Sequence, residues 1–328
     1  MSLNIIVEQL INGITLGSMY ALIALGYTLV YGILLMINFA HSELFMLGAY
    51  VGLGVLQLLT NPEVAAGLSA RWPFFAWLTP AQAFFTNGSI GMMCLFAVVF
   101  FVSMIAIGLL GVIIERFAYR PLRHANRLAP LISAVGVSIF LQNAVLLWID
   151  SKQIPFPSPL GRSMAFTVAG VQVSALKVFI FVTAISLMVL LDLYISRSRM
   201  GKAMRATSQD REAAGLMGID INLAIMLAFF IGPALGAVAG VFYGMYYGSI
   251  VFSMGFIPGM KAFTAAVIGG IGNLRGAMLG GFVLGIVESL AAGFLSSGYK
   301  DVIAFAVLIL VLIFRPGGLL GESVVEKV

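Results

Sequence analysis

Residues 221–260 read INLAIMLAFFIGPALGAVAGVFYGMYYGSIVFSMGFIPGM and contain no Asp, Glu, Lys or Arg. One straight helix of this length would measure about 60 Å at a rise of about 1.5 Å per residue. The hydrocarbon core of a bilayer is only about 30 Å thick. We therefore predict one full membrane crossing, a turn near Tyr247 and Gly248, and a partial return.

The composition of the whole chain agrees with this interpretation. Of 328 residues, 61% are hydrophobic and 9% are charged, whereas a soluble domain carries about 25% charged residues. In lipid every backbone N–H and C=O must be paired internally, which leaves helices or closed barrels. The apolar runs are long and do not alternate with polar residues, so we predict an all-α polytopic membrane protein.

The first apolar stretch, residues 9–40, is also free of formal charge. It would measure about 48 Å as one helix, so it must tilt, break or leave the membrane. If it breaks, Gly26, Gly32 and Asn38 are the places where a break could occur.

Shorter apolar stretches supply the other crossings. We predict spans at residues 44–59, begun by His41-Ser42-Glu43, and at 89–114, 128–149, 177–194, 276–295 and 302–314. Residues 263–271 are too short to cross alone. The total is about eight transmembrane helices plus a short or re-entrant segment at 261–272, in a single transmembrane domain covering residues 1–328.

Basic residues cluster in two loops. These loops hold nine of the 18 lysines and arginines: Arg116, Arg120, Arg123, Arg127, Arg197, Arg199, Lys202, Arg205 and Arg211. The positive-inside rule makes both loops cytoplasmic. The loops at 61–88, with Trp72 and Trp77 as interfacial anchors, and at 151–170, a proline-stiffened extended stretch, then face outward.

The cytoplasmic loop at residues 196–220 is long for a connector. Residues 201–206 and 211–218 look like two short helices, with Ser208 as the N-cap of the second and Gly218 at its end. Small residues Ala213 and Ala214 allow close approach by another backbone. One interpretation is a lever that docks on a cytoplasmic motor protein, and the alternative is an amphipathic linker on the membrane surface.

Polar residues within apolar spans usually face a cavity or a partner, because they are costly in lipid. The candidates for a translocation pathway are Asn38, His41, Glu43, Asn143, Lys261, Asn273 and Glu288, with Arg275 beside them. Simpler roles stay open for several of them. His41 and Glu43 would then cap a helix, and Lys261 would extend to an interface. Glu288 is the strongest candidate, and we expect it to pair with Lys261 or Arg275, or to hydrogen-bond to a neighbouring helix.

Glycines recur every fourth residue at Gly232, Gly236 and Gly240, and again at Gly272, Gly276 and Gly280. This spacing gives a helix one smooth face for close packing, which we expect to lie within this subunit. Asn38 and Asn273 are candidate markers of a divergent internal repeat.

Several segments resemble the branched-chain amino acid permeases of bacterial ABC importers, the LivH family. They are NGITLGSMYALIALGYTLVYG (12–32), MINFAHSELFMLGAY (36–50), ERFAYRPLR (115–123), LISAVGVSIFLQN (131–143) and GMKAFTAAVIGGIGNLRGAMLGG (259–281). The coupling loop of that family has a Glu-Ala-Ala core and a following glycine, matched here by Glu212-Ala213-Ala214 and Gly218. Gly201, Arg205, Ser208 and Arg211 complete the loop that the resemblance assigns to ATPase coupling.

The resemblance implies an ABC importer permease of the bacterial inner membrane that translocates leucine, isoleucine and valine by alternating access. It implies a second related permease, two cytoplasmic ATPases and a periplasmic binding protein as partners. The chain itself lacks a G-x-x-x-x-G-K-[ST] phosphate loop. We expect no catalytic residues, metal, cofactor or nucleic acid. An ion-coupled secondary transporter and a permease for urea or short amides are the alternatives.

Overall fold

Eight helices in the described residues are long and apolar enough to cross a membrane. The computed structural model describes residues 3–72, 77–86, 88–123, 125–126, 128–160, 165–168 and 170–321. The eight are α1 (Leu3–Leu34), α2 (His41–Thr60), α5 (Gly88–Ile114), α6 (Leu128–Trp148), α7 (Ala175–Arg197), α10 (Ile221–Tyr247), α12 (Leu274–Phe294) and α13 (Lys300–Phe314). A shorter apolar helix, α11 (Phe256–Gly269), accompanies them. The predicted fold class is therefore confirmed.

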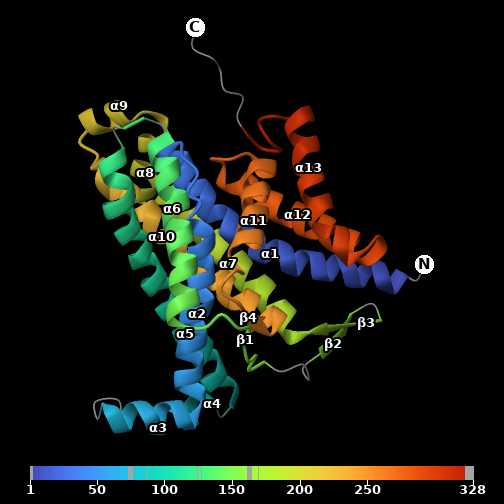
Figure 1. Ribbon diagram of the computed structural model, residues 1–328. Coiled ribbons are helices and arrows are strands. Elements are labelled where there is room, and N and C mark those ends of the chain that lie inside the picture. Colours follow the sequence, from blue (N-terminus) through green and yellow to red (C-terminus); the bar gives the residue numbers. More distant parts are fainter. Residues whose placement is uncertain are drawn as a thin grey trace.

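The two basic loops lie at the same end of the molecule, which we call the basic end (Figure 1). Arg123 follows the π-helix η2 (Glu115–Tyr119) and the 3-10 turn η3 (Arg120–Leu122), and it donates to the side chain of Asn222 at the start of α10 at 2.8 Å. The second loop forms α8 (Arg199–Gln209) and α9 (Arg211–Leu216). Arg127 lies outside the described residues.

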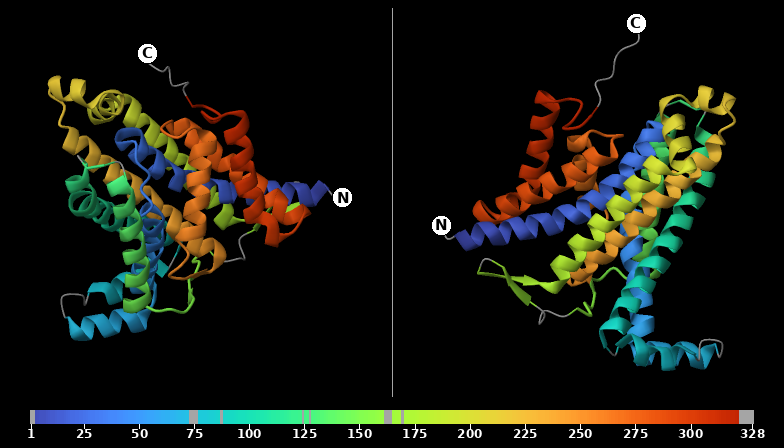
Figure 2. Two further views of the ribbon diagram at one scale, coloured as in Figure 1. Left: turned by 45° about the horizontal axis from the view of Figure 1, so that its top comes forward. Right: turned by 180° about the vertical axis from the view of Figure 1, so that it is seen from behind.

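The opposite end, which we call the outer end because the positive-inside rule predicts that it faces outward, carries the remaining short elements (Figure 2). They are α3 (Pro62–Arg71), α4 (Leu78–Thr86), the hairpin of β2 (Ala165–Val168) and β3 (Val171–Ser174), the pair β1 (Ile154–Pro155) and β4 (Ser249–Ile250), and the 3-10 turn η4 (Ser297–Tyr299). Trp72 and Trp77 are 59% and 54% exposed there, as suits interfacial anchors. The two helices in the loop at 61–88 were not predicted.

Helix α1 is longer than the hydrocarbon core is thick, and it tilts to fit. It continues without a break from Leu3 to Leu34 and crosses the bundle obliquely (Figure 1). Gly26 and Gly32 stay helical, so the helix does not break at either glycine, and of the predicted alternatives the structure shows tilting. The helix ends at Leu35, whose φ of 55° is left-handed. Asn38 lies in the connection to α2.

Helices α2 and α11 both begin in the protein interior. The first turn of α2 lies against Gly236 and Gly240, in the middle of α10. Gly255 and Gly259, at the start of α11, lie against Ser42 and Glu43. Helix α11 then runs to the basic end, because Arg275 just beyond it pairs with Asp192 near the end of α7. Of the two predicted alternatives, the structure shows a short helix.

The element contacts indicate an inverted internal repeat. One half consists of α1, α2, α5 and α6, and the other of α10, α11, α12 and α13. The first helix of each half packs on the second and third helices of the other half, and within each half the fourth helix lies beside the second. Because α1 runs toward the basic end and α10 away from it, the two halves have opposite orientations, a common transporter arrangement. Asn38 precedes the second helix of its half and Asn273 the third, so the two asparagines do not correspond.

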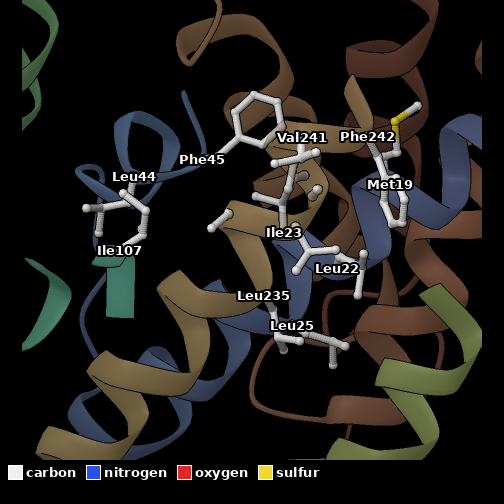
Figure 3. Close-up of a cluster of buried hydrophobic side chains, with 14 of the residues drawn as sticks. Met19, Leu22, Ile23, Leu25, Leu44, Phe45, Ile107, Leu235, Val241 and Phe242 are labelled. Atoms are coloured by element: carbon white, nitrogen blue, oxygen red, sulfur yellow. The ribbon is translucent and has the colours of Figure 1, made fainter. Parts of the chain in front are cut away.

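The core forms where α1 and α10 cross. The most apolar windows of α1 and α10 are 94% and 78% buried, against 6% for α13. Figure 3 shows side chains of α1, α2, α5 and α10 packed together there. Gly232 lies against Gly26, and Gly276 and Gly280 lie against α11. The glycine stripes therefore pack within the subunit, as predicted, although Gly272 lies in the turn before α12.

Candidate functional site

The predicted coupling loop at residues 196–220 forms two helices at the basic end, each capped by a side chain. Ser198 accepts a hydrogen bond from Gly201 N at 2.9 Å, and Asp210 accepts one from Ala213 N at 3.0 Å. Gly201 is buried against the end of α7, where a side chain would meet the backbone of Tyr194 and Ile195.

The predicted cap at Ser208 is wrong. Ser208 lies inside α8 and donates to the Arg205 carbonyl at 2.7 Å. Asp210 has the extended backbone, with φ −155°, that an N-cap requires. Its charged oxygen is also a stronger acceptor than a hydroxyl.

Helix α9 ends as predicted at Gly218, with φ +82°. Gly218 N donates to the Gly215 carbonyl and Ile219 N to the Ala214 carbonyl, both at 3.0 Å, which is the Schellman pattern. This turn presents an exposed tip, which we define as Glu212, Ala213, Leu216, Met217 and Gly218. Leu216 is 90% and Met217 82% exposed, whereas Ala214 is buried.

Arg211 connects α9 to α1. Its Nε and Nη2 both donate to the carbonyl of Ile33, at 3.1 and 2.6 Å. This carbonyl belongs to the last turn of α1, which has no intrahelical donor left. Burial lowers the pKa of the Arg211 guanidinium, yet arginine stays protonated in proteins. Arg205, by contrast, donates to Ser196 nearby.

His41 is buried at the start of α2. Its Nε2 lies 3.1 Å from the Ile23 carbonyl of α1, and because a carbonyl can only accept, Nε2 carries the proton. Its ring packs edge-on against Tyr27, with 4.8 Å between centroids. No side chain caps α2. The capping role predicted for His41 and Glu43 is therefore wrong: both lie in the interior.

Glu43 lies where the first turns of α2 and α11 meet. It is 1% exposed, and Ser138 of α6 donates to its Oε1 at 3.4 Å. Oε2 lies beside Gly255 and has no hydrogen-bond donor within the described ranges. The partial positive charges of the two helix N-termini favour a carboxylate at this place. Asn38 is likewise buried and accepts from the Tyr119 hydroxyl at 2.7 Å.

Glu288 and Lys261 form a buried ion pair between α12 and α11. Lys261 Nζ lies 2.6 Å from Glu288 Oε1, and the Tyr20 hydroxyl of α1 donates to Oε2 at 2.9 Å. Asp301 of α13 lies 2.5 Å from the same ammonium group. These groups line a cavity of about 340 Å³ near β4. Of the two predicted partners for Glu288, Lys261 is the right one.

The other predicted residues lie apart from this cavity. Asn143 is on an exposed face of α6 and donates to the Ile139 carbonyl of its own helix. Asn273 caps α12, accepting from Gly276 N at 3.1 Å, and donates to the Leu320 carbonyl at 2.8 Å. Arg275 pairs with Asp192 at the basic end.

Sequence reasoning missed the aromatic and acidic partners of the predicted residues. Tyr20, Tyr119 and Asp301 lie in or next to apolar runs that gave no sign of their contacts. Leu216 and Met217 were passed over because apolar residues in a polar loop are unremarkable until their exposure is known. In the part of the chain that the structure describes, no three His, Cys, Asp or Glu side chains gather as metal ligands would.

Residues 9–312 match the family described as branched-chain amino acid transport system / permease component. The chain belongs to this family. It is 48% identical over 324 residues to the high-affinity branched-chain amino acid transport system permease protein BraD of Pseudomonas aeruginosa, across 98% of this chain and 97% of that protein. It is 44% identical over 327 residues to the corresponding protein LivH of Escherichia coli K12, with the same coverage.

A more distant relative is the autoinducer 2 import system permease protein LsrC of Enterobacter sp. 638, 31% identical over 57% of this chain and 55% of that protein. No solved structure matches the chain significantly. The family and the eight long apolar helices identify a multi-pass inner-membrane permease component, a non-catalytic part of a transport system. The predicted family, location and non-enzymatic role are confirmed.

Proposed function

We propose that this permease carries leucine, isoleucine and valine inward as the membrane subunit of an ATP-driven importer. The observation that carries the proposal is near-complete alignment, at 44% to 48% identity, with permeases named for high-affinity branched-chain amino acid transport. The exposed tip at the basic end supports the proposal, because a cytoplasmic ATPase needs a protruding element of the permease to bind.

The proposed mechanism is alternating access driven through α1. ATPase closure pushes the tip, Arg211 transmits the movement to the end of α1, and α1 carries it to the interior. There Tyr20 bonds to Glu288 and the Ile23 carbonyl bonds to His41. Movement of α1 would therefore shift both α12 and the start of α2.

The proposal includes three kinds of partner: a second, related permease, two cytoplasmic ATPases and a periplasmic binding protein. Residues 1–328 act as one transmembrane unit in it. The large apolar side chains exposed on α6, such as Ile132 and Phe140 at 69% and 63%, require lipid or a partner helix as cover.

Uptake of labelled leucine into proteoliposomes tests the proposal. We expect uptake by the complete transporter that requires both ATP and the binding protein. Glu212→Lys or Gly218→Pro should abolish uptake without affecting membrane insertion, since one reverses a charge on the tip and the other places proline at φ +82°.

Glu63→Lys is the matched control, because Glu63 is also an exposed glutamate in the first turn of a short helix, but at the outer end. Leucine transport by the lone chain on an ion gradient without ATP would instead identify a secondary transporter. Transport of urea or short amides in place of leucine would identify the other alternative.

A further inference from the structure

We propose that the cavity beside Lys261 binds a free amino acid as a zwitterion, with the α-carboxylate on Lys261 and the α-ammonium on Asp301. The inference rests on the proposed function, since it names where that substrate first contacts this chain. The cavity lies between α1, α10, α11, α12 and α13 and is bordered by Ser249 and Ile250 of β4. β4 pairs with β1 at the outer end, where a solute from outside would arrive.

The cavity is lined by two lysines, Lys261 and Lys300, and two carboxylates, Glu288 and Asp301. Lys261 contacts both carboxylates. Glu288 has no oxygen left for a ligand, because its side chain is 2% exposed and its two oxygens accept from Lys261 and Tyr20. Asp301 is different: its Oδ1 is buried beside Lys261 without an aligned hydrogen bond within the described residues, but its side chain as a whole is 38% exposed. A ligand ammonium would approach the exposed part of this carboxyl group.

Lys261 can serve a ligand carboxylate at the same time. An ammonium group has three donors, and Glu288 takes one of them at 2.6 Å. If the ligand ammonium pairs with Asp301, Lys261 no longer needs to pair with Asp301. The lysine ammonium can then donate to the ligand carboxylate instead. The exchange conserves charge, because a zwitterion brings one positive and one negative group.

The walls fit an aliphatic side chain. Ile250, Met254, Ile257 and the rings of Tyr243 and Tyr247 line the cavity. Burial of a leucine or valine side chain against such a lining is favourable, because it removes apolar surface from water. A volume of about 340 Å³ is near the lower limit of ligand pockets, roughly 300 Å³, which suits one amino acid.

A purely structural role would also tie α11, α12 and α13 together through Lys261. Such a latch needs no ligand and shows no preference among small solutes. The two roles are separated by whether a zwitterion protects the cavity better than analogues that lack one of its charges.

Thiol protection measures this directly. The probe is Ile257→Cys, at a position that lines the cavity and is 49% exposed, with Cys94→Ala, in the complete transporter without its binding protein. We expect millimolar leucine to slow modification by a polar thiol reagent severalfold. Leucine methyl ester, which lacks the carboxylate, and 4-methylpentanoate, which lacks the ammonium, should protect much less.

Asp301→Asn should remove the protection by leucine, whereas Asp150→Asn, an exposed carboxylate at the outer end of α6, should leave it unchanged. Absent protection, or equal protection by leucine and both analogues, would overturn the proposal. Uptake by the transporter with its native Ile257 separates a failure of this site from a failure of the proposed function. ATP-dependent leucine uptake without protection refutes this site alone, and a transporter that ignores leucine refutes the proposed function.

Discussion

Replacing Arg211 by alanine should uncouple the permease from its ATPases. The change removes both hydrogen bonds from the guanidinium to the Ile33 carbonyl, and with them the polar connection of α9 to the end of α1. We expect ATP hydrolysis by the assembled transporter to continue while leucine uptake per ATP falls.

The structure sets the size of the effect. A hydrogen bond from a charged donor contributes about 1.5–3 kcal/mol, and a cation at a helix C-terminus adds about 0.3–1 kcal/mol. Both bonds share one acceptor in a partly exposed site, so we take about 2 kcal/mol for the pair. A coupling free energy of this size corresponds to roughly thirtyfold.

The assay is leucine uptake and phosphate release measured on the same proteoliposomes. Arg211→Lys should be intermediate, because lysine keeps the charge but cannot form the two-pronged contact. Arg205→Ala is the matched control, since Arg205 of α8 also donates to a backbone carbonyl, that of Ser196 in α7. An unchanged ratio of uptake to hydrolysis in Arg211→Ala, or an equal loss in Arg205→Ala, would refute the proposed role of Arg211.

Three further changes test other parts of the structure. Leu216→Glu should reduce co-purification of the ATPases at least tenfold without affecting insertion, because a buried leucine contributes about 1.5–3 kcal/mol; retention at the normal level would count against the tip. Lys261→Met should lower the free energy of unfolding by about 3–5 kcal/mol, since it leaves the buried carboxylate of Glu288 without its cation. Thermal unfolding of the detergent-solubilised protein measures this change. The double variant Lys261→Met with Glu288→Leu should recover most of the lost stability. Gly240→Leu should abolish folding, because the new side chain would overlap the backbone of α2. Gly136→Leu should fold normally, because Gly136 faces open space. Equal yields of folded protein from the two variants would refute the close packing.

The crossings were predictable because length and polarity decide them. A stretch such as residues 128–149 has one solution in lipid, and the structure gives Leu128–Trp148. The interior starts of α2 and α11 were not predictable in the same way. Residues 35–40 and 248–255 are mostly apolar whether they continue as helix or enter the interior as non-helical chain, so hydropathy does not mark them.

The polar residues were found by a simple rule, but their partners were not. Burial of Glu288 follows from its place in an apolar span, and its choice between Lys261 and Arg275 depends on the packing of α11 against α12. Tyr20 and Asp301 come from α1 and α13, far away in sequence. Long-range contacts of this kind are set by how helices pack, and one sequence carries no direct record of that packing.

Each half of the inverted repeat has a buried glutamate, Glu288 within α12 and Glu115 just after α5. Gly281 lies against Ala21 of α1, and Gly108 lies against Phe230 of α10. A glutamate follows each glycine after seven residues, Glu288 in one half and Glu115 in the other.

Each of these carboxylates is buried and paired with a cation, Glu288 with Lys261 and Glu115 with Arg123. Their surroundings differ, however. Glu288 borders a cavity at the outer end, whereas Glu115 begins the π-turn that places Tyr119, 1% exposed, on Asn38. Since the halves have the same framework, opening one end and closing the other requires only that they exchange conformations.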